Sequence, residues 1–145
     1  MAEDPKFWVG VVCANHVKIA ASEGVCAFSH GKEVAIGKLT TGDRFAYYSP
    51  QTGIGEGDKV QGFTAIGTVS EGTPYQKNWA GTAMTAWVRD AQYDVLGQVS
   101  IRPLIEHLGF ISNPRYWGMA FRRGLFAVDV RDFEMIEDVM RRANG

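Results

Sequence analysis

The chain has 145 residues, enough to bury one hydrophobic core but too few for two ordinary domains, so we expect a single domain over residues 1–145. Apolar residues make up 46% of the chain, which excludes a disordered protein. The formal net charge of -1 argues against non-specific binding of long nucleic acid, which usually needs a basic excess, so any contact with nucleic acid should be local or supplemented by a partner.

Short strands and one helix are predicted for the first part of the chain. Residues 7–12 form an uncharged run rich in β-branched and aromatic side chains, which indicates a buried strand. Asn15 is a good N-cap for a helix that Gly24 would end. Residues 25–28 indicate a second short strand, and a polar loop follows at 29–32.

A glycine-rich segment, residues 53–59, separates two further strands that we predict over 44–48 and 60–69. It superficially resembles a phosphate-binding loop, but a strand rather than a helix follows it, and Glu56 and Asp58 would repel phosphate. We therefore expect a mobile connection that is free to act as a lid.

The last part of the chain combines short strands with helices. We predict strands over 85–95, 99–101 and 124–128, and short helices that begin at Pro103 and Pro114. The final helix has the clearest pattern, because Asp129 can cap it and one face is apolar. That face carries Phe133, Ile136, Val139 and Met140.

Residues that commonly bind metals lack the spacing of a metal site, because His16, His30 and His107 are scattered and neither Cys13 nor Cys26 belongs to a Cys-x-x-Cys pair. We expect no metal and no cofactor. A reactive cysteine is not expected either, since reactivity needs exposure and a lowered pKa. The N-terminus shows no export signal and no apolar run could span a membrane, so a cytoplasmic protein with reduced thiols is expected.

A set of aromatic and polar residues suits a nucleobase, which has two π-faces and a polar edge. Its members are Trp8, Phe28, Ser29, His30, Lys32, Tyr48, Ser49, Tyr75, Trp87, Arg89, Trp117 and Arg122. Composition alone favours the plainer interpretation that most of these aromatic side chains belong to the hydrophobic core.

Several stretches resemble the EVE-domain family, part of the wider PUA-like superfamily that includes the YTH readers of methylated adenine. They are Phe7-Trp8-Val9-Gly10-Val11, the segment 38–50 with its Gly42-Asp43 and Tyr48-Ser49-Pro50 motifs, Phe63-Thr64-Ala65-Ile66-Gly67, Ile101-Arg102-Pro103, Tyr116-Trp117-Gly118 and Phe121-Arg122-Arg123-Gly124. Their order and spacing make the resemblance specific over residues 7–136, and it is strongest to single-domain bacterial members that are largely uncharacterised.

The resemblance implies an α+β fold, namely a PUA-like pseudo-barrel of mixed strands with short helices packed around it and a C-terminal amphipathic helix. It also implies a pocket for a modified or flipped base. The pocket residues implied are Trp8, Cys13, Phe28, Ser29, His30, Lys32, Tyr48, Ser49 and Pro50, with Arg89, Trp117 and Arg122 at the rim or on phosphates. The YTH cage tryptophan that follows the second strand has no counterpart here, which leaves the ligand open.

Three functions remain open at this point. The first is a binding module for a modified nucleobase in DNA or RNA, or for a small-molecule ligand, acting away from membranes as a monomer or weak homodimer. The second is an enzyme on a nucleotide or other small anion, with His30 as general base and Lys32 or Arg122 holding the anion. The third is a protein-interaction subunit that uses an apolar face.

Overall fold

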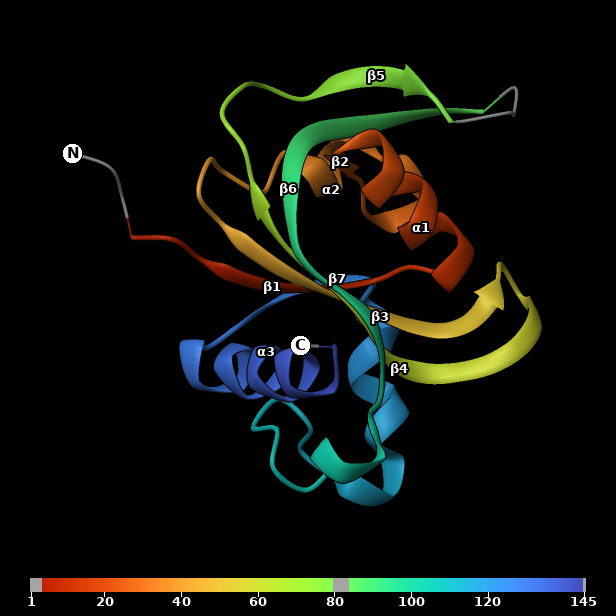
Figure 1. The fold of residues 1–145 in the computed structure, drawn as a ribbon, viewed down its shortest axis with the longest axis vertical. Helices are drawn as coiled ribbons and strands as arrows, with labels where there is room; N and C mark the ends of the chain where they lie inside the picture. Colours follow the sequence, from red (N-terminus) through yellow and green to blue (C-terminus); the bar gives the residue numbers. More distant parts are fainter. Residues whose placement is uncertain (1–3, 80–83, 145) are drawn as a thin grey trace.

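The structure, a computed structural model, describes residues 4–79 and 84–144, and these residues form one strongly curved sheet with helices on both faces (Figure 1). The strands are β1 (Phe7–Val11), β2 (Val25–Cys26), β3 (Arg44–Gly53), β4 (Glu56–Val69), β5 (Tyr75–Asn78), β6 (Thr85–Ser100) and β7 (Leu125–Val128). Their order is β2-β6-β4-β3-β1-β7, and β5 pairs with β6. The β1–β3 pair is parallel, and the other pairs within the described residues are antiparallel.

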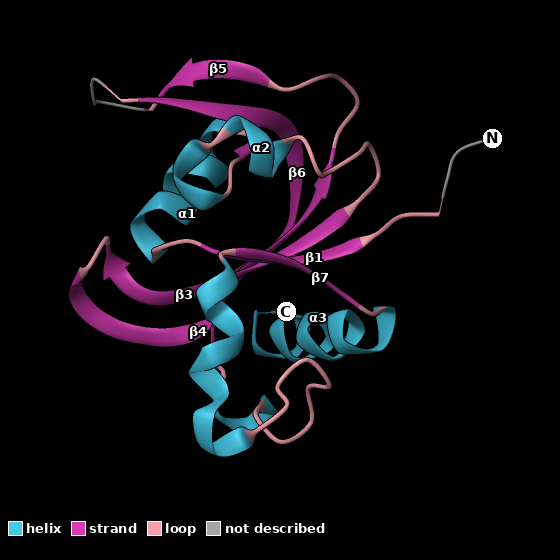
Figure 2. Ribbon diagram, turned by 180° about the vertical axis from the view of Figure 1, so that it is seen from behind, coloured by secondary structure: helices cyan, strands magenta, loops and turns pink. Residues whose placement is uncertain are grey.

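Helices cover the sheet in two groups, which Figures 1 and 2 show from opposite sides. The α-helices are α1 (Ala14–Glu23), α2 (Glu33–Ile36) and α3 (Val130–Asn144), and the 3-10 helices are η1 (Ser29–Gly31), η2 (Arg102–Leu104) and η3 (Pro114–Arg123). The helices α1 and α2 lie on one face, whereas α3 and η3 lie on the other. The predicted α+β architecture, with short helices around a mixed sheet and a C-terminal amphipathic helix, is confirmed.

The glycine-rich segment lies in a hairpin whose two strands extend further than predicted, and its mobility and use as a lid stay predictions. The strand β3 continues to Gly53 and β4 begins at Glu56, with these two residues opposite each other. The turn between them contains Gly55 at φ +64°, a conformation that glycine adopts without strain. We call the paired segment 51–59 the hairpin arm, and Figure 1 shows it projecting from the sheet.

Other boundaries also differ from the sequence prediction. Cys13 rather than Asn15 precedes the first helical residue, and no side chain caps that helix end. The strand β6 is continuous from Thr85 to Ser100, because irregularities in its pairing with β4 absorb the glycine at position 97. The strand β5 and the helix α2 were not predicted.

Two adjacent tyrosines of β3 divide the hydrophobic core between the two faces of the sheet. Tyr47 packs with Phe28 and Phe45 on the face that α1 and α2 cover. Tyr48 packs on the opposite face, where its ring stacks on Phe121 at a centroid distance of 3.9 Å. Successive side chains of a strand point to opposite faces, so Tyr47 and Tyr48 cannot both pack on the same face of the sheet.

Asp43 fixes the register of the parallel pair β1–β3. Its side chain is 1% exposed, and its two carboxylate oxygens accept four hydrogen bonds. The donors are the amides of Lys6 and Thr40 and the indole Nε1 of Trp8, each at 3.0 Å, and the Thr40 hydroxyl at 3.2 Å. Because no hairpin joins two parallel strands, this carboxylate supplies a local link between their beginnings.

Replacing Asp43 with alanine should destabilise the fold by roughly 3 kcal/mol, because buried donors, including the Trp8 indole, would lose their acceptor. Urea denaturation followed by tryptophan fluorescence measures the change. Asp58→Ala, on the exposed hairpin arm, is the control and should change stability little. Equal stability of the two variants would show that the Asp43 carboxylate does not hold this strand pair.

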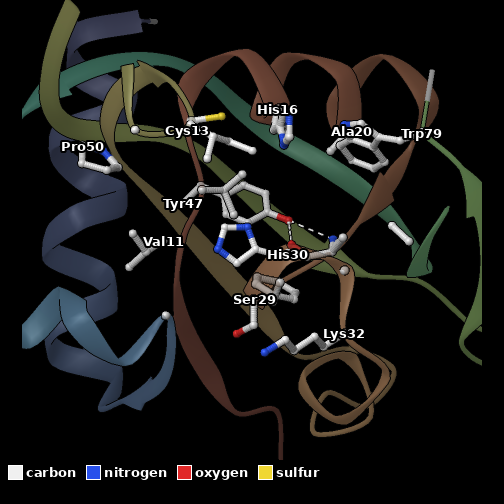
Figure 3. A pocket seen from close by; sticks show the side chains of 18 of the residues that line it. Val11, Cys13, His16, Ala20, Ser29, His30, Lys32, Tyr47, Pro50 and Trp79 are labelled. Atoms are coloured by element: carbon white, nitrogen blue, oxygen red, sulfur yellow. Dashed lines mark hydrogen bonds between the residues drawn. The ribbon is translucent and has the colours of Figure 1, made fainter. Parts of the chain in front are cut away.

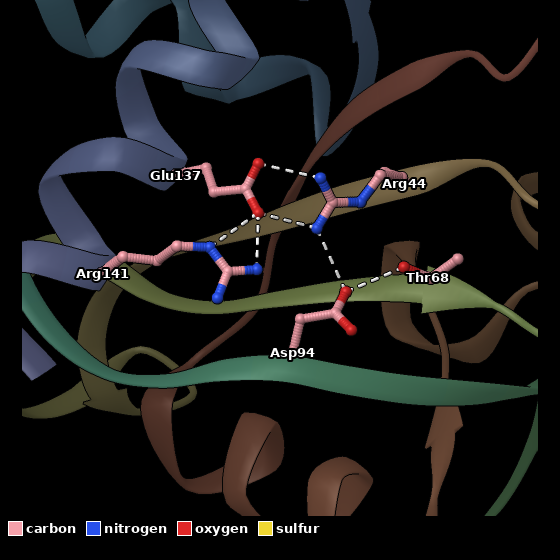
Figure 4. A network of polar contacts seen from close by, with 5 residues as sticks. All are labelled: Arg44, Thr68, Asp94, Glu137 and Arg141. Carbon is pink, nitrogen blue, oxygen red and sulfur yellow. Dashed lines mark hydrogen bonds and ion pairs between the residues drawn. The ribbon is translucent and has the colours of Figure 1, made fainter. Parts of the chain in front are cut away.

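A second polar network fixes α3 against the sheet (Figure 4). The Arg44 guanidinium donates to both carboxylate oxygens of Glu137, at 2.8 and 2.9 Å, and to Asp94 at 3.1 Å. Thr68 donates to the same Asp94 carboxylate, and Arg141 donates to Glu137. The hydrogen bonds from Arg44 are the main reason why the pKa of Glu137 lies below its ordinary value of 4.5.

Because of this network, the free energy of unfolding should decrease as the pH falls into the acid range. Because the pKa of Glu137 is lower in the folded chain than in the unfolded chain, its contribution is complete above pH 4.5 and is lost as the pH falls through the folded value. Glu137→Gln should cost about 1–2 kcal/mol at neutral pH and flatten the decline in acid. Urea titrations at several pH values test this, with the exposed Glu134→Gln as the control; an unchanged pH profile for Glu137→Gln would contradict it.

Candidate functional site

A cavity of about 440 Å³ opens on the α1 side of the sheet (Figure 3), within the size range of ligand pockets. The end of β1, the first turns of α1 and the turn η1 contribute to its walls, together with the hairpin arm, the start of β6 and the end of η3. Elements that are far apart in the sequence therefore meet at one place.

Aromatic side chains form part of the wall of this cavity. They include Phe28, Tyr47 and Trp79. The Tyr47 hydroxyl donates to the Ala27 carbonyl at 2.8 Å and accepts from the Ala27 amide at 3.1 Å, which holds the ring in place. Burial raises the pKa of Tyr47 well above its ordinary value, so the hydroxyl stays protonated.

A strained turn carries His30 to the cavity. Ser29, His30 and Gly31 all have left-handed backbone angles, with φ of 51°, 61° and 75°. For residues other than glycine this region costs about 1–2 kcal/mol each. Gly31 is required by packing as well, since a Cβ there would lie 2.6 Å from that of Ala86 on β6. Strain of this kind is typical of sites where the backbone must aim a side chain.

The polar side chains that line the cavity include two histidines and three cations. His16 from α1 and His30 from η1 both line it, and the view of Figure 3 shows Tyr47 between them. Burial, with a smaller effect of His30, lowers the pKa of His16, so His16 is neutral at pH 7 and can both donate and accept a hydrogen bond. The cations that line the cavity are Lys32, Arg122 and Arg123, and no Asp or Glu is among its described lining residues.

The structure brings together seven of the twelve residues implied by the family resemblance. Those that line the cavity are Cys13, Phe28, Ser29, His30, Lys32, Pro50 and Arg122. The other five, Trp8, Tyr48, Ser49, Arg89 and Trp117, do not line it.

Four of these five have buried structural roles instead. Trp8 donates its indole N–H to Asp43, and Tyr48 is packed on the other face of the sheet. The Ser49 hydroxyl is fully buried and donates to the Val12 carbonyl at 2.7 Å. Arg89 is 6% exposed, and its guanidinium donates to the carbonyls of Leu39, Ser70 and Gly72 and to the Thr41 hydroxyl. Its charge is used inside the protein and cannot meet a phosphate.

Trp117 is half-buried on η3, outside the cavity. Its ring packs edge-on against Tyr48 and Phe121, and the Arg102 guanidinium lies over it, 5.3 Å from the ring centroid. The expectation that Trp117 forms the rim of the pocket is therefore wrong, because this tryptophan packs against the core cluster that contains Tyr48 and lies beside Arg102 rather than Arg122.

Sequence reasoning missed several residues that line the cavity, namely His16, Tyr47, Trp79, Met84 and Arg123. Tyr47 could have been found from the alternation of β3, had the face toward α1 been known. His16 lies three residues after Cys13, which precedes α1. Residues at this spacing share one face of a helix, so the expected pocket residue Cys13 could have indicated His16. Trp79 follows β5, a strand that was not predicted.

Other kinds of site find little support in the part of the chain that the structure describes. Among residues 4–79 and 84–144, no three His, Cys, Asp or Glu side chains gather as a metal site requires. Burial raises the pKa of the Cys26 thiol to about 12, so this cysteine is not a nucleophile at neutral pH. Within the same ranges no helix has the length and apolar character needed to cross a membrane.

Comparison with known sequences connects residues 6–139 to the family model of the EVE domain. The UPF0310 protein msl3206 of Mesorhizobium japonicum is 38% identical over 136 residues, which cover 92% of this chain and 91% of that protein. The UPF0310 protein YdcG of Bacillus subtilis is 31% identical over 134 residues, with 92% and 91% covered.

Comparison with solved structures shows the same fold at low identity. The YTH domain of the Zygosaccharomyces rouxii MRB1 protein, solved in complex with N6-methyladenosine RNA, has a TM-score of 0.63 at 13% identity and covers 96% of this chain and 88% of that one. A hypothetical protein from Leishmania major has a TM-score of 0.63 at 11% identity, with 99% of both chains covered. The predicted PUA-like fold, shared with YTH domains, is confirmed.

The turn at Ser29–Gly31 can be tested by comparing two glycines that both have positive φ. Gly42→Ala adds a Cβ in open space, whereas Gly31→Ala adds one against Ala86. We expect Gly42→Ala to cost about 1 kcal/mol and Gly31→Ala at least about twice as much, because only the second has a steric conflict. Thermal unfolding of the two variants measures the difference, and equal losses would contradict the close packing of η1 on β6.

Proposed function

This chain belongs to the EVE-domain family, and from that premise we propose that it binds nucleic acid by holding one nucleobase, turned out of its stack, in the cavity beside Tyr47. The observation that carries the proposal is the chemical division of the cavity. Aromatic and aliphatic walls surround polar groups and cations, and none of the described lining residues carries a carboxylate. A nucleotide has the same division, with an apolar π-face, a polar edge and an anionic phosphate.

The residues then take distinct roles. The aromatic walls Phe28, Tyr47 and Trp79 enclose the base. His16 and His30 meet its polar edge, and a neutral imidazole suits this role because it can match a donor or an acceptor. Lys32 and Arg122 bind the phosphates next to the base, whereas the Arg123 guanidinium lies over the Phe126 ring, 4.0 Å from its centroid.

Relatives of the same fold support this assignment in general terms. The YTH domain of the Zygosaccharomyces rouxii protein is in complex with RNA that carries N6-methyladenosine. The cavity here includes aliphatic surface from Val11, Ala20 and Met84, which would favour a base with an added methyl group. Burying one such group contributes about 0.8 kcal/mol, so we propose a preference of about fourfold for a methylated base over its plain form.

Removing the imidazole of His30 should weaken nucleobase binding by about 1–3 kcal/mol, because the bound base would lose a hydrogen-bonding partner. His107→Ala is a matched control, since His107 is exposed and does not line the cavity. Calorimetric titration with plain and methylated nucleosides and with short oligonucleotides, at low and physiological salt, measures the effect. Equal binding by His30→Ala and the wild type, or no saturable binding across the panel, would refute the assignment of this cavity.

A further inference from the structure

The helix η3 leads away from the cavity with an unusual outer surface. Its residues Pro114–Arg123 include three arginines and no acidic residue, although the whole chain has a net charge of -1. In a 3-10 helix the side chains at positions i and i+3 lie in line. Met119 and Arg122 therefore lie in line, and Tyr116 precedes them at a kink, where its backbone angles (φ -118°, ψ 42°) are not helical. We call these three exposed residues the outer row; the tyrosine is 58% and the methionine 56% exposed.

This row is continuous with the cavity, because Arg122 at its end is one of the lining residues. At the far end the Arg115 guanidinium lies 5.5 Å from the centre of the Tyr116 ring. The seven residues after this kink, 117–123, span roughly 14 Å as a 3-10 helix, which exceeds the size of a single nucleotide. Figure 2 shows the helix running from the region near β7 to the end of the molecule beyond α3.

A further cation, from outside η3, lies beside the same helix. Arg102 is held by the Gln61 side chain, whose Oε1 accepts a hydrogen bond at 2.9 Å, and its guanidinium lies over the ring of Trp117. Two arginines, Arg102 and Arg115, thus lie beside the rings of Trp117 and Tyr116 on η3. An apolar docking site for a protein would instead present a contiguous apolar patch. Cations beside exposed π-faces are the pattern that binds phosphates and unpaired bases.

We propose that the outer row of η3 binds the nucleotides adjacent to the base in the cavity, and that it does so only when they are single-stranded. This inference rests on the proposed function. A base stacks on Tyr116 and against Met119, while Arg115 and Arg122 meet the phosphates on either side. Stacking on a side chain needs an exposed base face, which paired bases in a duplex do not offer.

The test compares three ligands, each as DNA and as RNA. They are a single nucleotide, a short single strand that contains it, and the same strand paired in a duplex. The wild type should bind the single strand more tightly than the nucleotide and than the duplex. Tyr116→Ala should weaken binding of the strand by about tenfold and leave binding of the nucleotide unchanged. Tyr116→Phe keeps the ring and should restore binding of the strand.

Charge is tested separately through salt. A plot of log affinity for the strand against log salt concentration falls with salt, and Arg115→Gln should make this fall less steep by about one unit of slope, as loss of one phosphate contact does. Arg142→Gln is the control, because Arg142 is 77% exposed on α3 and pairs with Asp138. Its salt slope should equal that of the wild type.

The outcomes separate this inference from the proposed function. Strand binding that depends on His30 but not on Tyr116, or a duplex that binds as tightly as the strand, would overturn the role of η3 and leave the cavity assignment intact. Strand binding that depends on Tyr116 but not on His30 would keep the role of η3 and overturn the cavity assignment. Absence of binding to all three ligands overturns both.

Discussion

The parallel pairing of β1 with β3 is the constraint on which the rest of the structure depends. Parallel strands cannot be joined by a tight turn, and here the carboxylate of Asp43 ties the start of both strands through Lys6 and Trp8. A shift of one residue would exchange the faces of Tyr47 and Tyr48. The Tyr47 ring would then leave the cavity and the Tyr48 ring would leave Phe121, so one buried carboxylate controls both the wall of the site and the packing under η3.

Buried charge in this protein serves architecture, and in the proposed function the cations that line the cavity serve the ligand. Asp43 and Arg89 are both almost fully buried, and both bind the segment between α2 and β3, through Thr40 in one case and Leu39 and Thr41 in the other. Their hydrogen bonds satisfy groups that water cannot reach. The cations that line the cavity come from two other places: Lys32 directly follows η1, and Arg122 and Arg123 end η3. A small net charge is thus compatible with a local basic site.

The sequence was sufficient for the architecture and for part of the site. Alternating and β-branched runs identified most strands, and Asp129 caps α3 as predicted, accepting a hydrogen bond from the Asp132 amide. His30, Lys32 and Arg122 were also placed correctly beside the cavity. Ser49 and Trp8 were not, because a motif marks a residue as constrained without saying whether the constraint is a ligand or the fold. The strained angles of Ser29 and His30 arise from packing against β6, which no local pattern contains.

The hairpin arm has a further consequence for the behaviour of the protein at high concentration. The strand β6 pairs with β4 only from Gly62 onward within the described residues, so the outer edge of β4 along the arm is open to solvent. An open strand edge is a template on which the strand of another molecule can add. Glu56, Asp58 and Lys59 are exposed along this edge, and charges at such positions oppose that addition. The acidic residues that make the arm unsuitable for phosphate thus protect the domain from aggregation through its sheet.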